Sequence, residues 1–432
     1  MNGKFQSLDG LRAIAIIMVF FHHIQVNRLL PVWNRPSFYF GLYVWQGWIG
    51  VDLFFVLSGF LITGILIDSR NAVNYFQGFY VRRILRIFPL YYLVLTGIIL
   101  ASQVLIWTHA DSAPVVASLV PLPQDRWTYF CYLTNWIGLW KAHWDTQFNS
   151  ILAHFWSLAI EEQFYLVWPL VVWLARPRLI PWIAGIVAGL SAIVRFAWAC
   201  HIGVQMLVPP ASIEVQLATI CRLDGLFIGA LCAYLFRDPE LMVKIRKWLP
   251  SVAFLGIGSF FAVFSSLLFF PVRAALLFYG PAPALPHSLE DATRLFNLCG
   301  GYTLLVLGFG GWVLFAAYTE TTNTLMQRFL RSRILGAIGK YSYGIYVFHL
   351  PIIGLAAAFI APKLRAANLT DGMITQCAYT FLITAASFVI PALSYEFFEK
   401  RILRLKRYFE PKYAIRSREA CSGQPVLAST TI

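Results

Sequence analysis

The sequence predicts an all-α, polytopic integral membrane protein: a helical bundle of about ten transmembrane helices with both termini in the cytoplasm. Of its 432 residues, 59% are hydrophobic and only 12% are charged, whereas a soluble domain carries about 25% charged residues. Long apolar runs, such as residues 11–24, 53–67 and 304–317, approach or reach the length that one helix needs to cross a bilayer core. The loops between these runs alternate between basic and weakly basic, as in a chain that crosses a membrane repeatedly.

The apolar runs and the charged loops between them place helices of roughly twenty residues along the chain. The expected spans are residues 10–30, 47–67, 84–106, 151–174, 180–200, 219–236, 250–270, 298–318, 341–361 and 374–398. Residues 1–400 are therefore predicted to form one membrane-embedded domain. Residues 401–432 are predicted to be a short basic cytoplasmic tail that is disordered at its end. No small-residue cleavage site follows the first apolar run, so the first helix is expected to remain in the mature protein.

The formal charge of +14 comes from lysines and arginines concentrated in alternate loops. Basic residues in a membrane protein most often mark cytoplasmic loops, which accounts for the charge without nucleic acid as a partner. The seven cysteines are scattered and lack the close spacing of a metal site or a disulfide framework. We therefore expect neither nucleic-acid binding nor a metal centre.

Two polar residues on the first expected helix would be costly in lipid. A charged group at the bilayer centre costs at least about 2.5 kcal/mol, so it needs a partner or a function. Arg12 and His23 are eleven residues apart, a helical rotation of about 1100°, so they share one face and His23 lies about 16 Å deeper. Arg12 can then hold an anionic group while His23 acts as a general base or carries a group transiently. The alternative is a structural histidine satisfied by a neighbouring helix.

The fourth expected span carries a second polar cluster. Ser157 and Glu161 share one helical face, and Glu162 lies on the adjacent face. Glu161 is about 15 Å from the outer end of this span, which is the depth of His23. A carboxylate at that depth can pair with the imidazole, raise its basicity and fix its tautomer. The alternative is a polar contact that only holds helices together.

Asp52 is a further carboxylate in the second expected span. Gly50, Ser58 and Gly59 around it favour close packing of helices. Asp52 is expected only modestly shallower than His23, so it is a second candidate for orienting the imidazole. Helix capping is the alternative role.

Arginines gather just before the third expected span. Arg82 and Arg86 are one helical turn apart, and Arg83 lies between them. Guanidinium groups bind phosphates in a forked geometry, so these three residues and Arg12 are candidates for binding a phosphate-bearing donor at the cytoplasmic rim. The alternative role of these arginines is to determine the membrane topology and to contact lipid headgroups.

Two weaker signals come from the later spans. Arg222 and Asp224 open the sixth span and can simply pair, whereas Arg195 in the fifth span has no obvious partner. His349 lies about 13 Å along the ninth span. With Ser157 it is a candidate for lining the same cavity, although a satisfied core histidine is the simpler interpretation.

Taken together, these segments resemble the acyltransferase 3 family of membrane O-acyltransferases over nearly the whole chain. The motifs that carry the resemblance are Ser7-Leu-Asp9-Gly-Leu-Arg12 with His23, Gly50-Val-Asp52 through Ser58-Gly59, Arg82-Arg83 through Pro89, Trp156-Ser157-Leu with Glu161-Glu162-Gln163-Phe-Tyr165, Arg222-Leu-Asp224, and Ser342-Tyr343 with His349. One departure is Arg401 after Glu399-Lys400, where the family often has proline. Many glycan-modifying members also carry an extracytoplasmic hydrolase-like domain that this sequence does not include, so the acceptor stays open.

The resemblance implies an acyltransferase for groups other than aminoacyl groups, in the inner membrane of a bacterium. It would move an acyl group, with acetyl expected, from cytoplasmic acyl-CoA to a hydroxyl of a cell-surface glycan, a lipid-linked sugar or a small molecule. The resemblance also implies that His23 is the essential histidine; acyl-CoA is then a co-substrate, and no bound cofactor is expected.

The alternative function is a transporter or flippase of an anionic or glycolipid substrate, because intramembrane histidine, glutamate and arginine also mark proton relays. The two halves of the sequence cannot be aligned, which disfavours the repeats typical of transporters. The acyl chain and the oligomeric state stay open.

Overall fold

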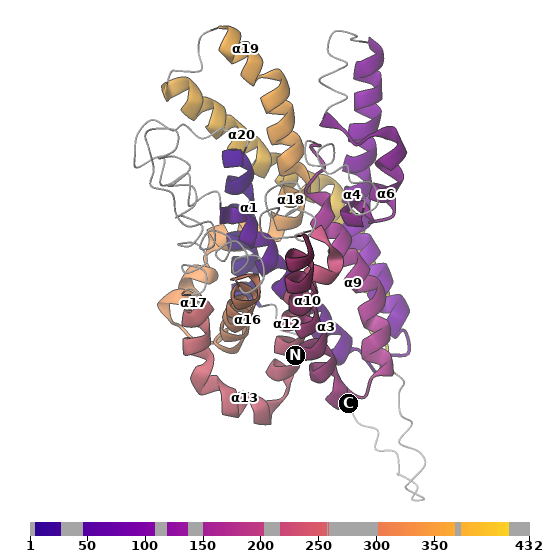
Figure 1. Cartoon of the computed structure of the whole chain (residues 1–432), viewed down its shortest axis with the longest axis vertical. Helices are drawn as coiled ribbons and strands as arrows, with labels where there is room; N and C mark the ends of the chain where they lie inside the picture. Colours follow the sequence, from indigo (N-terminus) through magenta and orange to yellow (C-terminus); the bar gives the residue numbers. More distant parts are fainter. Residues whose placement is uncertain are drawn as a thin grey trace, which may run out of the picture.

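The computed structural model describes residues 5–26, 46–108, 119–136, 150–202, 217–256, 258, 301–367 and 373–413. Within these ranges every regular element is a helix, and the longer helices run mainly along the long axis of the molecule (Figure 1). The principal helices are α1 (Gln6–Val26), α3 (Gly50–Asp68), α4 (Tyr75–Thr108), α6 (Arg126–Phe130), α9 (Phe155–Leu174), α10 (Ile180–Ile202), α12 (Leu223–Arg237), α13 (Pro239–Ile245), α16 (Tyr302–Tyr318), α17 (Leu325–Leu330), α18 (Arg333–Phe359), α19 (Ala361–Ala366), α20 (Met373–Ser394) and α21 (Lys400–Leu403). The all-α prediction is confirmed for the described residues.

Six described segments are long and apolar enough to cross a membrane. They are Gln6–Ile24, Gly47–Asp68, Tyr75–Thr108, Pro177–His201, Arg333–Leu364 and Ile374–Phe409. Their outward sides are strongly apolar: on α10, Trp182, Ile186 and Ile193 are 71%, 59% and 63% exposed. Contiguous exposed apolar surface of this kind is typical of a lipid-facing helix and not of a soluble monomer. The chain is therefore a multi-pass integral membrane protein, while the count of about ten spans stays a prediction.

Helix ends differ from the expected spans in three places. α4 begins at Tyr75 and not at residue 84, because arginine is a good helix former and the basic run does not interrupt the helix. α18 begins at Arg333 and not at residue 341, because the Ser332 side chain accepts a hydrogen bond from the Leu335 amide and caps the helix. α12 spans only 15 residues, after a 3₁₀ turn at Thr219–Cys221. Hydropathy thus located the helices but not their ends.

Other predictions lie partly outside the described residues. Of the seventh expected span, residues 250–256 and 258 are described. The predicted tail is described as far as residue 413, with a 3₁₀ helix at Arg404–Phe409, and the end that was predicted to be disordered lies outside the described residues.

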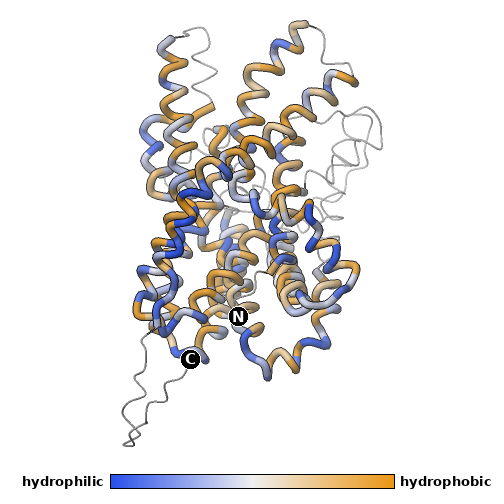
Figure 2. The backbone as a smooth tube through the Cα atoms, turned by 180° about the vertical axis from the view of Figure 1, so that it is seen from behind, coloured by the Kyte–Doolittle hydropathy of each residue, from blue (hydrophilic) through white to orange (hydrophobic). Residues whose placement is uncertain are grey.

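Three of the segments predicted to face the cytoplasm meet at one end of the bundle: the loop after α3, the loop after α12 and the tail. The Arg237 guanidinium, at the end of α12, donates two hydrogen bonds of 2.7 Å to the Asp68 carboxylate, at the end of α3. The tail contacts the same loop, since the Val73 amide donates to the Lys412 carbonyl at 2.8 Å and the Tyr413 hydroxyl donates to the Asp68 carbonyl at 3.0 Å. Hydrophilic segments gather mainly toward the end that carries the N and C markers (Figure 2). This grouping agrees with the predicted alternation of loops, and the side of the membrane that it faces stays a prediction.

α3 occupies the centre of the bundle, where it packs against α1, α9, α12 and α16. Its crossing with α12 depends on two glycines. A Cβ atom at Gly59 would overlap the Leu226 carbonyl oxygen, and one at Gly229 would overlap the Val56 carbonyl oxygen. Small residues at such crossings let two membrane helices approach at backbone distance, as the glycines and serine of this span predicted. The close crossing fixes α3 against α12 and so positions every polar side chain that α3 carries.

We expect Gly59→Leu to prevent the native packing of α3 on α12, because overpacking a tight contact costs about 1–3 kcal/mol or more. Thermal unfolding and size-exclusion profiles of the detergent-solubilised protein measure this effect. Gly97→Leu is the matched control, since a Cβ at Gly97 in α4 meets nothing within 4 Å. Equal stability of the two variants would contradict the close crossing.

Candidate active site

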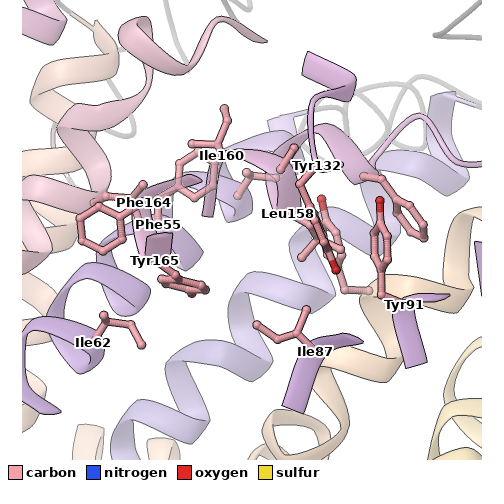
Figure 3. Packing of buried hydrophobic residues seen from close by; sticks show 14 of the residues in the cluster. Phe55, Ile62, Ile87, Tyr91, Tyr132, Leu158, Ile160, Phe164 and Tyr165 are labelled. Atoms are coloured by element: carbon pink, nitrogen blue, oxygen red, sulfur yellow. The ribbon is translucent and has the colours of Figure 1, made fainter. Parts of the chain in front are cut away.

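A cavity of about 100 Å³ lies between α1, α3, α4, α9 and α18. Part of its apolar wall is visible in Figure 3, where Phe55, Ile62, Ile87 and Leu158 surround it. Its polar lining consists of Arg12, Ser58, Arg83, Arg86, Ser157, Glu161, Tyr165, Ser342, Tyr343 and Tyr346. Arg12, from one group of candidate residues, thus lies on the same cavity as Ser157 and Glu161, from another, although the two groups belong to helices far apart in the sequence.

Three guanidinium groups dominate the charge of this cavity. Arg12 forms an ion pair of 2.9 Å with Asp9, one turn back along α1. The Arg83 guanidinium carbon lies 5.2 Å from the centre of the Tyr165 ring. The lining holds three arginines, Arg86 included, and one acidic residue, Glu161, so the cavity is suited to an anionic ligand.

Arg82 is the predicted donor-binding residue that does not line the cavity. Its Nε donates to the Gly78 carbonyl at 2.7 Å, one turn back along α4.

A second polar cavity of about 160 Å³ adjoins the first. Both are lined by Arg12, Arg86 and Tyr343, while Lys340 of α18 and Leu403 of the tail line only the second. The two cavities therefore lie one after the other from the helix ends near the basic tail toward the interior of the bundle. Arg12, Arg86 and Tyr343 lie where they adjoin.

The two glutamates of α9 are not placed beside His23. Glu161 accepts a hydrogen bond of 3.1 Å from the Tyr165 hydroxyl, which also contacts the Ser58 hydroxyl. Glu162 faces away from the cavity, and one of its carboxylate oxygens is buried without a hydrogen-bond partner among the described residues. The expected pairing of His23 with either glutamate is therefore not the arrangement in the structure. Helical rise predicted a common depth, but depth does not specify which way a side chain points around its helix.

His23 instead lies beside another histidine. Its Nδ1 is 2.9 Å from the Val19 carbonyl oxygen and 3.2 Å from Nε2 of His349, on α18. The ring centres of these two histidines are 4.9 Å apart, and the His154 ring centre is also 4.9 Å from that of His349. The Tyr346 hydroxyl, one turn from His349, donates to the His154 carbonyl at 2.9 Å.

Tyr346 connects this histidine group with the cavity. Its hydroxyl contacts the Ser157 hydroxyl, and both residues line the cavity. Ser157 lines the cavity, whereas His349 lies behind Tyr346 and contacts His23. The simpler interpretation of His349 from its sequence position was a satisfied core residue, because this is the usual role of a single buried histidine.

Asp52 pairs elsewhere than predicted. Its carboxylate forms an ion pair of 2.7 Å with Arg222, and both side chains are 3% exposed. The Arg222 guanidinium also lies over the Tyr302 ring, 4.5 Å from its centre. Asp224 pairs with Arg195 at 2.7 Å, so the expected Arg222–Asp224 pair is wrong and Arg195 has its partner. Asp52 is thereby part of a buried ionic cluster between α3, α10 and α12, and it does not orient His23.

These features define a membrane-embedded helical bundle with an arginine-lined interior cavity next to a pair of histidines. The sequence matches the model of the family described as an acyltransferase domain over residues 5–394. The chain therefore belongs to the acyltransferase 3 family of membrane O-acyltransferases. The family resemblance and the acyltransferase class that it implied are confirmed, and the match favours the enzyme over the transporter alternative.

Two relatives of the chain are named as O-acetyltransferases. The chain is 29% identical over 406 residues to peptidoglycan O-acetyltransferase OatA of Listeria monocytogenes, covering 92% of this chain and 55% of that protein. It is 27% identical over 403 residues to O-acetyltransferase OatA of Staphylococcus aureus, covering 91% of this chain and 56% of that protein. The chain thus spans about half the length of these relatives. No solved structure matches it.

We expect Asp52→Asn to destabilise the protein, on the order of 3 kcal/mol, because it leaves the buried Arg222 guanidinium without its counter-charge. Thermal unfolding in detergent measures the effect. Asp68→Asn is the control, because the Asp68–Arg237 pair is half exposed and such pairs contribute about 1 kcal/mol or less. If Asp52→Asn is as stable as Asp68→Asn yet loses turnover, Asp52 belongs to the chemistry after all.

Proposed function

We propose that this protein is an O-acetyltransferase that moves an acetyl group from cytoplasmic acetyl-CoA to a hydroxyl of peptidoglycan, in the cytoplasmic membrane of a bacterium. The observation that carries the proposal is the interior cavity with three guanidinium groups, which adjoins a histidine pair in a chain of the acyltransferase 3 family. The acetyl group and the peptidoglycan acceptor are proposed from the names of the relatives.

The donor is proposed to enter from the end where the basic loops gather. A CoA thioester carries phosphates at one end and the reactive carbonyl at the other. Arg83 and Arg86 are suited to the phosphates, since a guanidinium binds a phosphate through two parallel hydrogen bonds. Arg12 lies about 16 Å along α1 from His23, so phosphates held near Arg12 leave the acyl end free to extend toward the histidines.

The chemistry is proposed to be a direct transfer with His23 as general base. His23 takes the proton of the acceptor hydroxyl while the hydroxyl oxygen attacks the thioester carbonyl carbon. The carbon–sulfur bond then breaks, and the CoA thiolate leaves and takes the proton back from the imidazolium. The products are an O-acetyl ester and CoA, and His23 is restored.

The function is tested by mass spectrometry of muropeptides from cells with and without this protein. We expect muropeptides that carry an additional acetyl group only when the protein is present. Acetylation that appears on another envelope glycan or on a small molecule would preserve the enzyme class and replace the acceptor. No acetylated product in any fraction would contradict the proposal.

We expect His23→Ala to lower turnover by about a hundredfold or more, because a positioned general base typically contributes that much. The measurement is acetyl transfer from labelled acetyl-CoA by the purified protein. His201→Ala is the control, since His201 is an exposed histidine in the last turn of α10. Near-normal turnover in a folded His23→Ala protein would remove His23 from the mechanism.

We expect Arg83→Ala and Arg86→Ala to raise the KM for acetyl-CoA more than they lower kcat, because contacts with the phosphates are remote from the reacting carbon. Arg82→Ala should raise this KM less, since Arg82 does not line the cavity. Steady-state kinetics in detergent compares the three variants. If Arg82→Ala has the largest effect, the donor binds at the rim of the membrane and not in the cavity.

A further inference from the structure

The contacts at Nδ1 of His23 and at both ring nitrogens of His349 indicate which of these three atoms carry a hydrogen. Nδ1 of His349 faces two carbonyl oxygens, that of Tyr346 at 2.7 Å and that of Ile345 at 3.1 Å. A carbonyl oxygen is only an acceptor, so this nitrogen must carry a hydrogen and donate it.

The same reasoning applies to His23. Its Nδ1 faces the Val19 carbonyl oxygen at 2.9 Å, so it also carries a hydrogen. This nitrogen lies 3.2 Å from Nε2 of His349. Two N–H groups cannot point at each other, so Nε2 of His349 must present its lone pair. Nδ1 therefore carries a hydrogen in both rings, and in the neutral His23 ring the lone pair is on Nε2.

We propose that His349 is the positioning residue of the reaction: together with the Val19 carbonyl oxygen, it holds His23 in the tautomer whose Nε2 is the basic atom. This inference rests on the proposed function. His349 takes the role that a carboxylate would otherwise have, namely to fix the ring and its tautomer through the nitrogen that does not react.

The positive charge that forms on His23 during the reaction is stabilised by the same contacts of its Nδ1. The acceptor hydroxyl gives its proton to Nε2 of His23, and the oxygen bonds to the thioester carbonyl carbon. The imidazolium so formed keeps its Nδ1–H group between two acceptors, the Val19 carbonyl oxygen and Nε2 of His349. When the carbon–sulfur bond breaks, the proton on Nε2 goes to the leaving thiolate, and the neutral tautomer is restored.

The carboxylates near this site have other contacts. Glu161 accepts a hydrogen bond from Tyr165, and Asp52 pairs with Arg222. The His23–His349 contact therefore accounts for the orientation of the imidazole without either of them. His349 itself is held by its own helix, because both of its carbonyl partners belong to the preceding turn of α18.

The test compares two substitutions of His349 in the full-length protein. His349→Leu keeps similar bulk and removes the acceptor, whereas His349→Gln can present an amide oxygen in place of Nε2. We expect His349→Leu to lower kcat by about 10- to 100-fold, as is typical of residues that orient a reacting group. The KM for acetyl-CoA should stay within about twofold, because the donor contacts are untouched. His349→Gln should recover a large part of the lost kcat.

A spectroscopic measurement on the same proteins reports the tautomer directly. In protein with ¹⁵N-labelled histidine, the signals of His23 are assigned by their loss in His23→Ala. We expect a protonated Nδ1 and an unprotonated Nε2 in the wild type, and a larger share of the Nε2-protonated tautomer in His349→Leu, where the Val19 carbonyl oxygen remains as an acceptor but Nε2 of His349 is lost. A wild-type His23 protonated at Nε2 would overturn the inference.

Kinetic outcomes also separate this inference from the proposed function. If His23→Ala is inactive but folded His349→Leu turns over normally, the positioning role is wrong and the proposed function stands. If both His349 variants lose kcat and raise the donor KM equally, His349 only supports packing, and the inference fails. If His23→Ala retains turnover, the proposed mechanism fails before His349 is considered.

Discussion

Lipid offers no partner for a charged side chain, and this constraint organises the interior of the bundle. Two buried arginines form ion pairs with aspartates, Arg195 with Asp224 and Arg222 with Asp52, and these pairs join α3, α10 and α12. Arg83 and Arg86 are different, because they form no ion pair with another described residue and line a cavity instead. The charges that stabilise the fold are thus paired, and those left for a ligand face the interior space.

The polar interior divides into two zones that meet at one tyrosine. On one side of Tyr346 lie the arginines and the cavity, and on the other lie His23 and His349. The Tyr346 hydroxyl and Ser157 form the boundary between them. In the proposed reaction this boundary separates the part of the donor that is bound from the part that reacts, so binding and chemistry depend on different side chains.

The fold class, the membrane location and the family followed from composition, apolar runs and motifs, because each of these is a property of the chain itself. The helical distance of Arg12 from His23 holds because α1 is continuous, but that Arg12 lines a cavity was not predicted. The partners of His23 could not be predicted, because helical rise specifies depth whereas pairing also depends on rotation and on which helices are neighbours. Likewise, Arg82 and Arg83 lie about 40° and 60° from Arg86 around α4, so spacing alone could not decide which one shares the cavity with it.

The length of α4 has a consequence for how the protein sits in membranes of different thickness. At 34 residues it is about 50 Å long, whereas the hydrocarbon core is about 30 Å thick. Its far half is apolar and exposed, with Leu100 at 65% and Trp107 at 94%. This half, residues 90–108, is about 28 Å long, which matches the hydrocarbon core. Pro89 lies between it and Arg86, and a proline is where a helix loses a backbone hydrogen bond and can bend. The lipid-facing half can therefore adjust to bilayer thickness while the arginines keep their positions in the cavity.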